Sequence, residues 1–494
     1  MNYNISKSRY CSAVQCPKML WLQKNLPDEI DSSVMNQSVL DTGLAVGTLA
    51  MGLFDDFAEV PYGDLDNMIS TTKQLIEQKS PVIAEASLSI DGLFCSIDIL
   101  KVLENKEVEI FEVKSSTSVH DIYYHDVAFQ CYVLSQLGYT VKSCNIIHIN
   151  NQYERLGELD INEFFTVVDI TADALHLQPE VASNISNIRE YMLQTDEPTD
   201  DIGEHCFSPY SCGFFGYCTR KLPKPNVFDV AGTRTSTKFK CYRKGLVSFE
   251  DLNTCDAFSA SQHKQIEHEL FNYSPHIDKE SIKEFLKTIR YPLYFLDFES
   301  FQPAIPLYDH SRPFEQIVFQ YSLHYIERYG GELKHKEFLA CPGEDPRRKL
   351  AEQLCTDIPF DVCTTAYNMG FEKGRIKGLA EIFPDLSEHL MNIHDNIVDL
   401  MIPFQKKWYY CRAMQGSYSI KYVLPALFPD DPALDYHNLE GVHNGVEASE
   451  TYAKMATMTS EEAEIMRGLL LKYCGLDTYA MVKVWEKLKD VSEM

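Results

Sequence analysis

Carboxylates interrupt two of the most apolar strand-like segments of this 494-residue chain. Asp98 lies within the segment 93–102, and Asp297 and Glu299 lie within YFLDFE, residues 294–299. An isolated charge in a buried strand is costly, so such acids need bound cations or other partners. Carboxylates that converge in space hold the divalent metals that hydrolyse phosphodiesters. The pattern therefore predicts two metal-dependent hydrolytic sites.

The first acidic set joins Asp98 to Glu112-Val113-Lys114 on the next strand-like segment. Strand alternation puts Glu112 and Lys114 on one face and Val113 on the other. Pairing of the two strands would bring Asp98 beside Glu112. We then expect both carboxylates to bind a metal, with Lys114 contacting the attacking water or the scissile phosphate. The alternative is that these are edge-strand charges facing solvent.

The second acidic set begins with Asp297 and Glu299, which share one strand face. It continues far downstream with Asn368-Met369-Gly370-Phe371-Glu372 and with Tyr473-x-x-x-Asp477. A spacing of four on a helix puts Tyr473 and Asp477 on the same face. A further acid, Asp399, is expected to be a surface residue at a helix end and not a ligand.

Three of the 15 cysteines form a cluster with regular five-residue spacers: Cys206, Cys212 and Cys218. In a chain expected to be cytoplasmic, clustered thiols are more often metal ligands than disulfides. The first choice for a fourth ligand is Cys16, and Cys11 is the alternative. Thiolates suit an iron–sulfur cluster or zinc, but the spacing differs from the paired C-x-x-C of common zinc modules. The cysteines expected to be plain core residues include Cys95, Cys131, Cys144, Cys363 and Cys474.

The net charge of −27 argues against indiscriminate coating of nucleic acid, since such affinity comes from lysine and arginine. It does not exclude a nuclease, because bound cations offset clustered carboxylates. Two basic segments, 220–244 and 406–421, could guide a strand or be solvated faces. The chain has no apolar run of membrane-spanning length and no signal-peptide core at its N-terminus. We therefore expect a cytoplasmic protein without a membrane segment.

The length allows two or three domains. Helices are expected up to about residue 80 and again over 122–137, and the chain should end in two helices, one starting near 460–465 and one running to 488. Strands mixed with helices predict an α/β fold with mixed sheets. The strands are expected at 81–88, 93–102, 108–113, 143–150, 294–299, 317–325, 333–339 and 362–367. The domain boundaries are predicted at 1–225, 226–285 (a helical connector) and 286–494.

The first acidic set, with Gln130 on the following helix, resembles the PD-(D/E)xK nuclease superfamily and particularly its RecB-like branch. The resemblance implies a restriction-endonuclease-like fold, with Asp98 and Glu112 as metal ligands and with Lys114 and Gln130 in the catalytic site. Many RecB-like enzymes add a histidine from an N-terminal helix. The corresponding helix here has no histidine at residues 43–47, and Glu85 is the proposed substitute.

One cysteine before this core and three after it resemble the iron–sulfur staple of the RecB-like family, as in AddB and the CRISPR-associated RecB-like exonucleases. The resemblance implies a [4Fe–4S] cluster, favoured over zinc, that ties the two ends of the domain together. Its implied ligands are Cys16, Cys206, Cys212 and Cys218.

The second acidic set resembles the tyrosine variant of the DnaQ-like (DEDD) exonucleases, which have an RNase H-like fold. The resemblance implies 3′-to-5′ exonuclease chemistry with two Mg²⁺ or Mn²⁺ ions. It also implies that Tyr473 orients a water molecule and that the metal ligands are Asp297, Glu299, Glu372 and Asp477. Glu372 stands where that family has aspartate, so its carboxylate reaches one methylene further.

The order of these parts along nearly the whole chain is similar to the bacterial family catalogued as domain of unknown function 2779. Segments 150–157, 416–421 and 473–478 carry that likeness. Three hypotheses follow. The first is a two-site DNA nuclease in repair, recombination or phage defence. The second is an RNA-directed exonuclease with only the C-terminal site active. The third is a nucleic-acid-binding scaffold with decayed sites.

Overall fold

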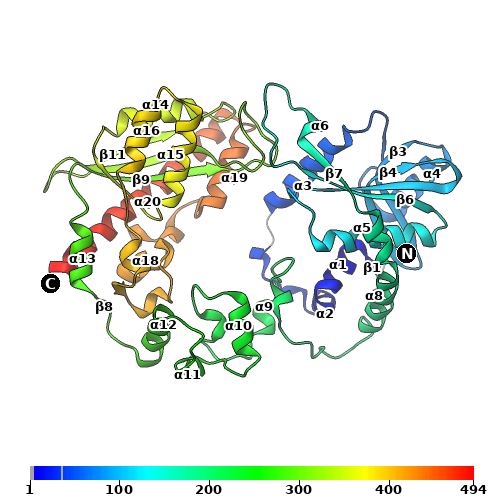
Figure 1. The fold of residues 1–494 in the computed structure, drawn as a ribbon, viewed down its shortest axis with the longest axis horizontal. Coiled ribbons are helices and arrows are strands. Elements are labelled where there is room, and N and C mark those ends of the chain that lie inside the picture. The colour runs from blue at the N-terminus through cyan, green and yellow to red at the C-terminus, as the bar shows by residue number, and fades with distance from the viewer. Residues whose placement is uncertain (1–4, 35–36, 494) are drawn as a thin grey trace. The chain divides into compact units, whose positions relative to one another are not determined.

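The computed structural model describes residues 5–34 and 37–493, and the chain forms two compact units (Figure 1). Unit 1 contains Met1–Lys221 and the excursion Ala304–Phe314, and unit 2 contains Leu222–Pro303 and Glu315–Met494. The excursion joins unit 1 through hydrogen bonds such as the one from the Arg155 guanidinium to the Pro306 carbonyl, 2.9 Å. Each unit has a mixed sheet with helices, as the α/β prediction requires.

Unit 1 is built on a seven-stranded sheet in the order β2-β3-β4-β5-β6-β7, with β1 paired to β4. Strands β3, β4 and β5 form an antiparallel meander, and β6 returns parallel to β5. The three meander strands and β6 confirm the strands predicted over 81–113 and 143–150. The strands are β1 (Ile5–Ser6), β2 (Ala58–Glu59), β3 (Val82–Ile90), β4 (Leu93–Val102), β5 (Glu107–Lys114), β6 (Thr140–Ile149) and β7 (Phe165–Asp169).

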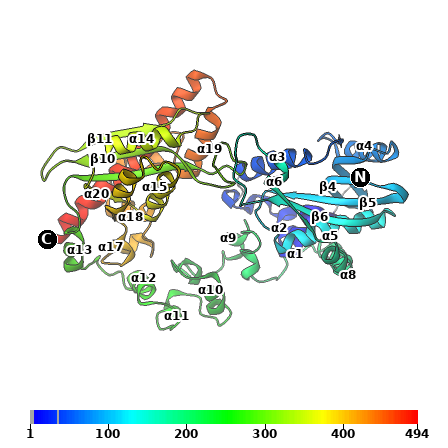
Figure 2. The same ribbon diagram turned by 45° about the horizontal axis from the view of Figure 1, so that its top comes forward.

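Two cores enclose this sheet. The larger core lies against α1, α5, α7 and α8, and the smaller one lies against α3. In Figure 2, α5 and α8 lie on one side of the strands and α3 lies on the other. The helices of unit 1 are α1 (Lys7–Gln15), α2 (Pro17–Asn25), α3 (Gln37–Met51), α4 (Leu65–Glu77), α5 (Asp121–Gln136), α6 (Ile161–Phe164), α7 (Thr171–His176), α8 (Gln178–Tyr191) and α9 (Phe215–Cys218).

Unit 2 is built on a five-stranded sheet in the order β11-β10-β9-β12-β13. Strand β9 runs antiparallel to β10 and parallel to β12. One face packs on α14, α15 and α16, and the other on α13, α18 and α20 (Figures 1 and 2). The strands are β8 (His276–Ile277), β9 (Leu293–Phe301), β10 (Ile317–Ile326), β11 (Lys334–Leu339), β12 (Cys363–Ala366), β13 (Ile397–Asp399) and β14 (Tyr409–Tyr410), with β8 and β14 paired separately.

The segment that follows the cysteine cluster forms α10, α11 and α12, which close over a small core of their own. This segment belongs to unit 2. The helices of unit 2 are α10 (Thr235–Tyr242), α11 (Phe249–Leu252), α12 (Ala260–Phe271), α13 (Lys279–Leu286), α14 (Arg347–Asp357), α15 (Gly370–Ile382), α16 (Ser387–Asp395), α17 (Ile402–Gln405), α18 (Ile420–Leu427), α19 (Gly445–Met455) and α20 (Ser460–Glu493).

The prediction of two terminal helices is wrong, because residues 460–493 form the single 34-residue helix α20. Gly468 and Gly475 lie inside this helix, and each costs about 1 kcal/mol relative to alanine. Burial outweighs that cost, since one buried large apolar side chain contributes about 1.5–3 kcal/mol and α20 buries several, including Leu470, Trp485 and Leu488. Across the described residues, every helix is too short or too polar to cross a membrane.

Candidate active sites and cysteine cluster

Glu112 is the centre of a buried polar network in unit 1. The residue is buried. Its Oε1 accepts hydrogen bonds from the ammonium groups of Lys7, 2.7 Å, and Lys114, 2.8 Å. Its Oε2 accepts one from the Gln130 amide, 2.6 Å. The structure therefore brings together Glu112, Lys114 and Gln130, three of the residues singled out from sequence, and adds Lys7.

Asp126 on α5 is a second member of this network that the sequence reading missed. Lys114 donates to its Oδ2, 2.5 Å, and Gln130 donates to its Oδ1, 3.3 Å. Burial alone would raise the pKa of Asp126, but the ammonium groups of Lys114 and Lys7 hold it well below its usual range. The missed signal is the spacing of four between Asp126 and Gln130, which puts both on one helix face.

Asp98 lies next to Glu112, as the predicted pairing requires. Ile99 pairs with Phe111, so Asp98 and Glu112 stand at the next step of the two strands, and Asp98 Oδ2 accepts the Val113 N–H, 2.7 Å. Burial, with the Glu112 carboxylate second, raises the pKa of Asp98 to about 7. Near neutral pH this carboxyl is therefore poised between a proton and a cation.

Glu85 stands at the position of β3 that faces Asp98, between the pairs Ala84–Ile99 and Ala86–Ile97. Its φ of 56° is left-handed, a rare and strained conformation for a non-glycine residue within a strand. Burial raises the pKa of its carboxyl, and the charges of Lys7 and Glu112 also act on it. Glu85 is therefore near enough to serve as the additional acid proposed from sequence.

The four predicted cysteine ligands come together although 190 residues separate Cys16 from Cys206. Burial raises the pKa of Cys206 to about 11, with further contributions from Cys212, Cys16 and Cys218. Gln15, next to Cys16, links this region to the segment around Cys206. Its amide donates hydrogen bonds to the carbonyls of His205 and Tyr210, both 2.7 Å. The alternative ligand Cys11 has different neighbours, because Asp126 and Lys7 act on its thiol.

The thiols are spread more widely than a single zinc ion requires. Tetrahedral zinc with Zn–S near 2.3 Å places its sulfurs about 3.8 Å apart. Among the described residues, the one group of potential ligands with all atoms within 4.8 Å of one another is Asp297, Glu299 and Cys474, and no three of the four clustered cysteines meet that limit.

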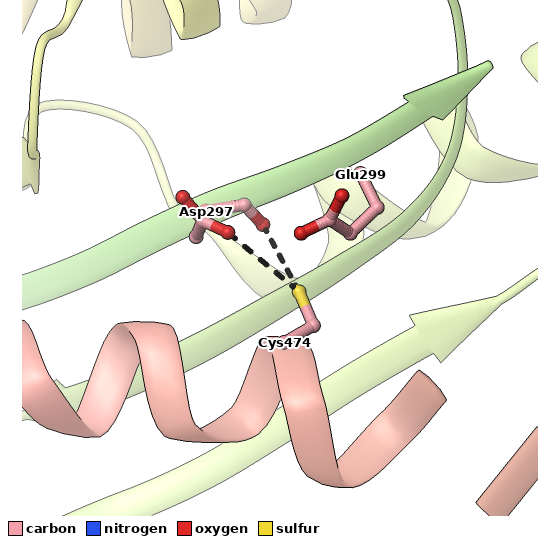
Figure 3. A group of neighbouring side chains, drawn as sticks. All are labelled: Asp297, Glu299 and Cys474. Atoms are coloured by element: carbon pink, nitrogen blue, oxygen red, sulfur yellow. Dashed lines mark hydrogen bonds between the residues drawn. The ribbon is translucent and has the colours of Figure 1, made fainter. Parts of the chain in front are cut away.

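Asp297 and Glu299 project from β9 toward α20, where they meet Cys474 (Figure 3). The register of α20 is set by polar contacts with β10. The Gln320 amide donates to the Leu470 carbonyl, 2.8 Å, and Thr478 hydrogen-bonds Ser322, 2.7 Å. These contacts hold the face of α20 that carries Tyr473, Cys474 and Asp477 over the two β9 carboxylates.

The prediction that Cys474 is a plain core residue is wrong. It is fully buried, but its sulfur lies 3.8 Å from the Asp297 carbonyl oxygen and 3.9 Å from Asp297 Oδ2 (Figure 3). Burial, followed by the charges of Asp297, Glu299 and Asp477, raises its pKa well above the ordinary value. The thiol therefore stays protonated and acts as a hydrogen-bond donor to Asp297. The apolar sequence around it gave no sign of this role.

Glu372, in the first turn of α15, is a further buried acid whose charge acts on Asp297 and Glu299. Its side chain is 2% exposed, and its Oε2 has no hydrogen-bond partner among the described residues. Burial raises its pKa to about 8. The carboxylates of Asp297 and Glu299 are both influenced by Glu372. A buried carboxylate oxygen without a hydrogen-bond partner, within electrostatic range of Asp297 and Glu299, fits a bound cation.

The expectation that Asp399 is a surface residue at a helix end is wrong. Asp399 is buried at the end of β13 and accepts the backbone N–H groups of Asn368, 2.9 Å, Met369, 3.2 Å, and Met401, 2.9 Å. These bonds hold the turn at Asn368, whose φ is 71°, and so place the start of α15. Asp399 positions Glu372 through the backbone and has no direct place among the expected ligands.

Asp477 is held by two tyrosines. Tyr436, in the turn Tyr436–Asn438, donates its hydroxyl to Asp477 Oδ1, 2.5 Å, and its ring lies 6.1 Å from that of Tyr473. Burial raises the pKa of Asp477 to about 6, while hydrogen bonding from both tyrosines opposes that rise. Lys421 is exposed and its ammonium acts on both Asp477 and Glu299. Tyr436 was missed because nothing in its local sequence marks it.

The two basic segments are partly neutralised. Arg220 pairs with Glu197, 2.9 Å, and Arg412 with Glu269, 2.7 Å. Lys407 is buried, with its ammonium 3.9 Å from the centre of the Tyr410 ring. Lys421, in the second segment, is the lysine whose charge acts on both Glu299 and Asp477.

Residues 294–419 match the family described as Domain of unknown function (DUF2779). This quarter of the chain holds Asp297, Glu299 and Glu372. The chain is also similar to two uncharacterized proteins. It is 28% identical over 245 residues to UU173 of Ureaplasma parvum, covering 44% of this chain and 34% of that protein. It is 26% identical over 216 residues to MG366 of Mycoplasma genitalium, covering 40% and 32%. The matched parts span about one third of each relative's length, and the family match shows a likeness for residues 294–419.

Proposed function

We propose that this protein is a metal-dependent nuclease with an active site in each unit. The observation that carries the proposal is the buried acidic group of unit 2. Ligand atoms of Asp297 and Glu299 lie within 4.8 Å of each other and of Cys474, and the charges of Asp477 and Glu372 act on both carboxylates. The pKa values of Asp297 and Glu299 are raised well above the ordinary carboxyl value by burial and then by their acidic neighbours. Such a group is stabilised by protons or by divalent cations.

In this proposal unit 2 is an RNase H-like exonuclease and unit 1 a PD-(D/E)xK nuclease, with DNA the favoured substrate of both. Bound Mg²⁺ or Mn²⁺ would activate water and offset charge on the scissile phosphate. In unit 2 the oxygen ligands suit those ions. Tyr436 holds the Asp477 carboxylate by a hydrogen bond. The Tyr473 hydroxyl would orient a water molecule, and Lys421 would contact a phosphate.

Unit 1 offers the same chemistry from different residues. Glu112 and Asp98 supply the carboxylates, and the Gln130 Oε1 is buried without a partner among the described residues, so the donor set fits a cation. Lys114 holds its proton firmly, because the carboxylates of Asp126 and Glu112 raise its pKa despite burial. Its ammonium therefore serves to stabilise charge on the phosphate and not as a base.

The test is a cleavage assay on labelled single- and double-stranded DNA and RNA with Mn²⁺ or Mg²⁺. Lys114→Met should abolish the share of cleavage that survives Asp297→Asn, because it removes the ammonium group proposed to stabilise charge on the phosphate. Lys101→Met is the matched control, since Lys101 pairs with Glu109 at 2.9 Å on the same two strands. If the Lys114→Met, Asp297→Asn protein cleaves as fast as Asp297→Asn alone, the proposed nuclease site in unit 1 is contradicted. If the wild-type protein cleaves RNA and not DNA, RNA is the substrate.

Glu372→Asp should lower unit 2 activity about tenfold, the effect of losing about 1.4 kcal/mol of transition-state stabilisation when a carboxylate that binds the metal is drawn back. The longer side chain fits its place, because Asp399 fixes the start of α15 and the chain cannot move closer to compensate. The measurement is kcat in a Lys114→Met background, and Glu381→Asp, on the exposed surface of α15, is the control. An increase in kcat would indicate instead a weakened descendant of the aspartate pattern.

Metal-free protein should lose stability as the pH rises. The pKa values of Asp477, about 6, Asp98, about 7, and Glu372, about 8, exceed the unfolded value near 4. Between about pH 4 and 8 the folded state therefore holds protons that the unfolded state has released, so stability falls with rising pH. Thermal unfolding should show a lower Tm at pH 8 than at pH 6, and a larger rise on adding Mn²⁺ at pH 8. Equal Mn²⁺ effects at both values would contradict a carboxylate metal site.

A further inference from the structure

Lys7 reaches the Glu112 site from the start of the described chain. It is the first residue of α1, directly after β1, whose Ile5 and Ser6 pair with Leu93 and Phe94 of β4. The Ser6 side chain caps α1 by accepting the Arg9 N–H, 3.3 Å. Strand pairing and helix cap together fix the backbone of Lys7, so its side chain is aimed into the site by the fold.

Two ammonium groups share one carboxylate oxygen in this site. Lys7 and Lys114 both donate to Glu112 Oε1, at 2.7 and 2.8 Å, and Lys7 also lies 3.5 Å from Asp126 Oδ1. Asp98 is within electrostatic range of both lysines. The carboxylates of Glu112, Asp126 and Asp98 thus face two lysines. The proposed mechanism uses only one of these lysines, Lys114, to stabilise charge on the phosphate. The second lysine supplies positive charge where a cation would otherwise be held.

We propose that Lys7 is a built-in counter-ion that competes with the divalent metal for Glu112. It keeps the carboxylates of the metal-free site together, and it leaves Glu112 Oε1 when the ion binds. This inference rests on the proposed function, because it takes Glu112 as a metal ligand. Lys7 thereby sets the metal concentration at which the unit 1 site becomes loaded.

The side chain of Lys7 is suited to this exchange. A lysine ammonium is a compact charge on a flexible stem, so it can withdraw without movement of the backbone. The Lys7 side chain is 19% exposed, against 2% for Glu112, so part of the lysine side chain lies at the surface. Metal binding must first break the hydrogen bond from Lys7 to Glu112. The displaced ammonium then stays close enough to repel the ion, so both effects weaken metal binding.

The test is Mn²⁺ binding measured by calorimetry at pH 8 in an Asp297→Asn, Glu299→Gln background, where the unit 2 group is disabled. Lys7→Met should bind Mn²⁺ about tenfold more tightly, the factor expected when one charge-assisted contact no longer opposes binding. Lys7→Gln, which keeps a donor but loses the charge, should bind more tightly too, and it serves if Lys7→Met fails to fold. Lys101→Met should leave the affinity unchanged.

An affinity that is unchanged or weaker in both Lys7 variants, with the parent protein binding Mn²⁺, overturns the role of Lys7 and leaves the proposed nuclease site intact. Binding that depends on Asp98 and appears only when Lys7 is replaced supports the competition. No binding in the parent or in either variant overturns both the competition and the metal site of unit 1.

Discussion

Asp297→Asn should lower phosphodiester hydrolysis by the unit 2 site about a thousandfold. A metal acting as a Lewis acid supplies several kcal/mol of transition-state stabilisation, and about 1.36 kcal/mol corresponds to tenfold in rate. Asp297 is the residue on which Asp477, Glu299 and Glu372 all act, so it stands at the centre of the carboxylate group. Single-turnover cleavage of a 5′-labelled strand in a Lys114→Met background measures this site alone.

The matched control for Asp297→Asn is Asp357→Asn. Asp357 is also buried in unit 2, but it accepts hydrogen bonds from Tyr321, 2.6 Å, and Lys336, 2.9 Å, away from the carboxylate group. Its replacement should reduce thermal stability and leave the rate per folded molecule unchanged. Equal rates for wild type and Asp297→Asn would rule out the unit 2 site as the catalyst.

We propose that the four cysteines hold an iron–sulfur cluster, so Cys206→Ser should abolish cluster binding and destabilise unit 1. The buried Cys206 lies where the four thiols influence one another, and the group joins the α1–α2 region to the segment that ends unit 1. A metal group that links distant segments contributes its binding energy to folding. We expect anaerobically purified protein to show the broad visible absorption of a thiolate-bound iron–sulfur centre and to contain iron and acid-labile sulfide.

The variant should lose this absorption and unfold at lower temperature. Cys355→Ser is the control, because Cys355 is half-buried and lies outside the cluster. It should keep the full iron content. Stoichiometric zinc without iron in the wild-type protein would contradict the iron–sulfur assignment and leave a zinc staple in its place.

Strand periodicity was sufficient to predict the local parts of both sites. Asp98 and Glu112 lie on neighbouring strands joined by a short turn, so alternation and pairing predicted their adjacency. Asp297 and Glu299 share a strand face for the same reason. The four-residue helical spacing likewise placed Tyr473 and Asp477 on one face of α20.

Contacts between distant segments were beyond such patterns. Lys7 is 105 residues from Glu112, and Tyr436 is 41 residues from Asp477, and neither has a local signature. Asp399 shows a different difficulty. Asp399 accepts hydrogen bonds from backbone N–H groups of a turn 30 residues away. Every residue except proline has a backbone N–H, so the sequence of the turn does not reveal this contact. Cys474 was predicted to be a core residue because its apolar neighbours in the sequence indicate burial. They do not indicate whether the buried thiol contacts apolar side chains or a carboxylate.

Anomalous diffraction from crystals soaked in Mn²⁺ would locate the metal in unit 2 directly. We predict manganese peaks bounded by the carboxylates of Asp297, Glu299 and Asp477, with Glu372 turned toward them, and loss of these peaks in Asp297→Asn crystals. Soaked wild-type crystals that diffract well but show no manganese among these carboxylates would contradict the proposed metal-dependent nuclease.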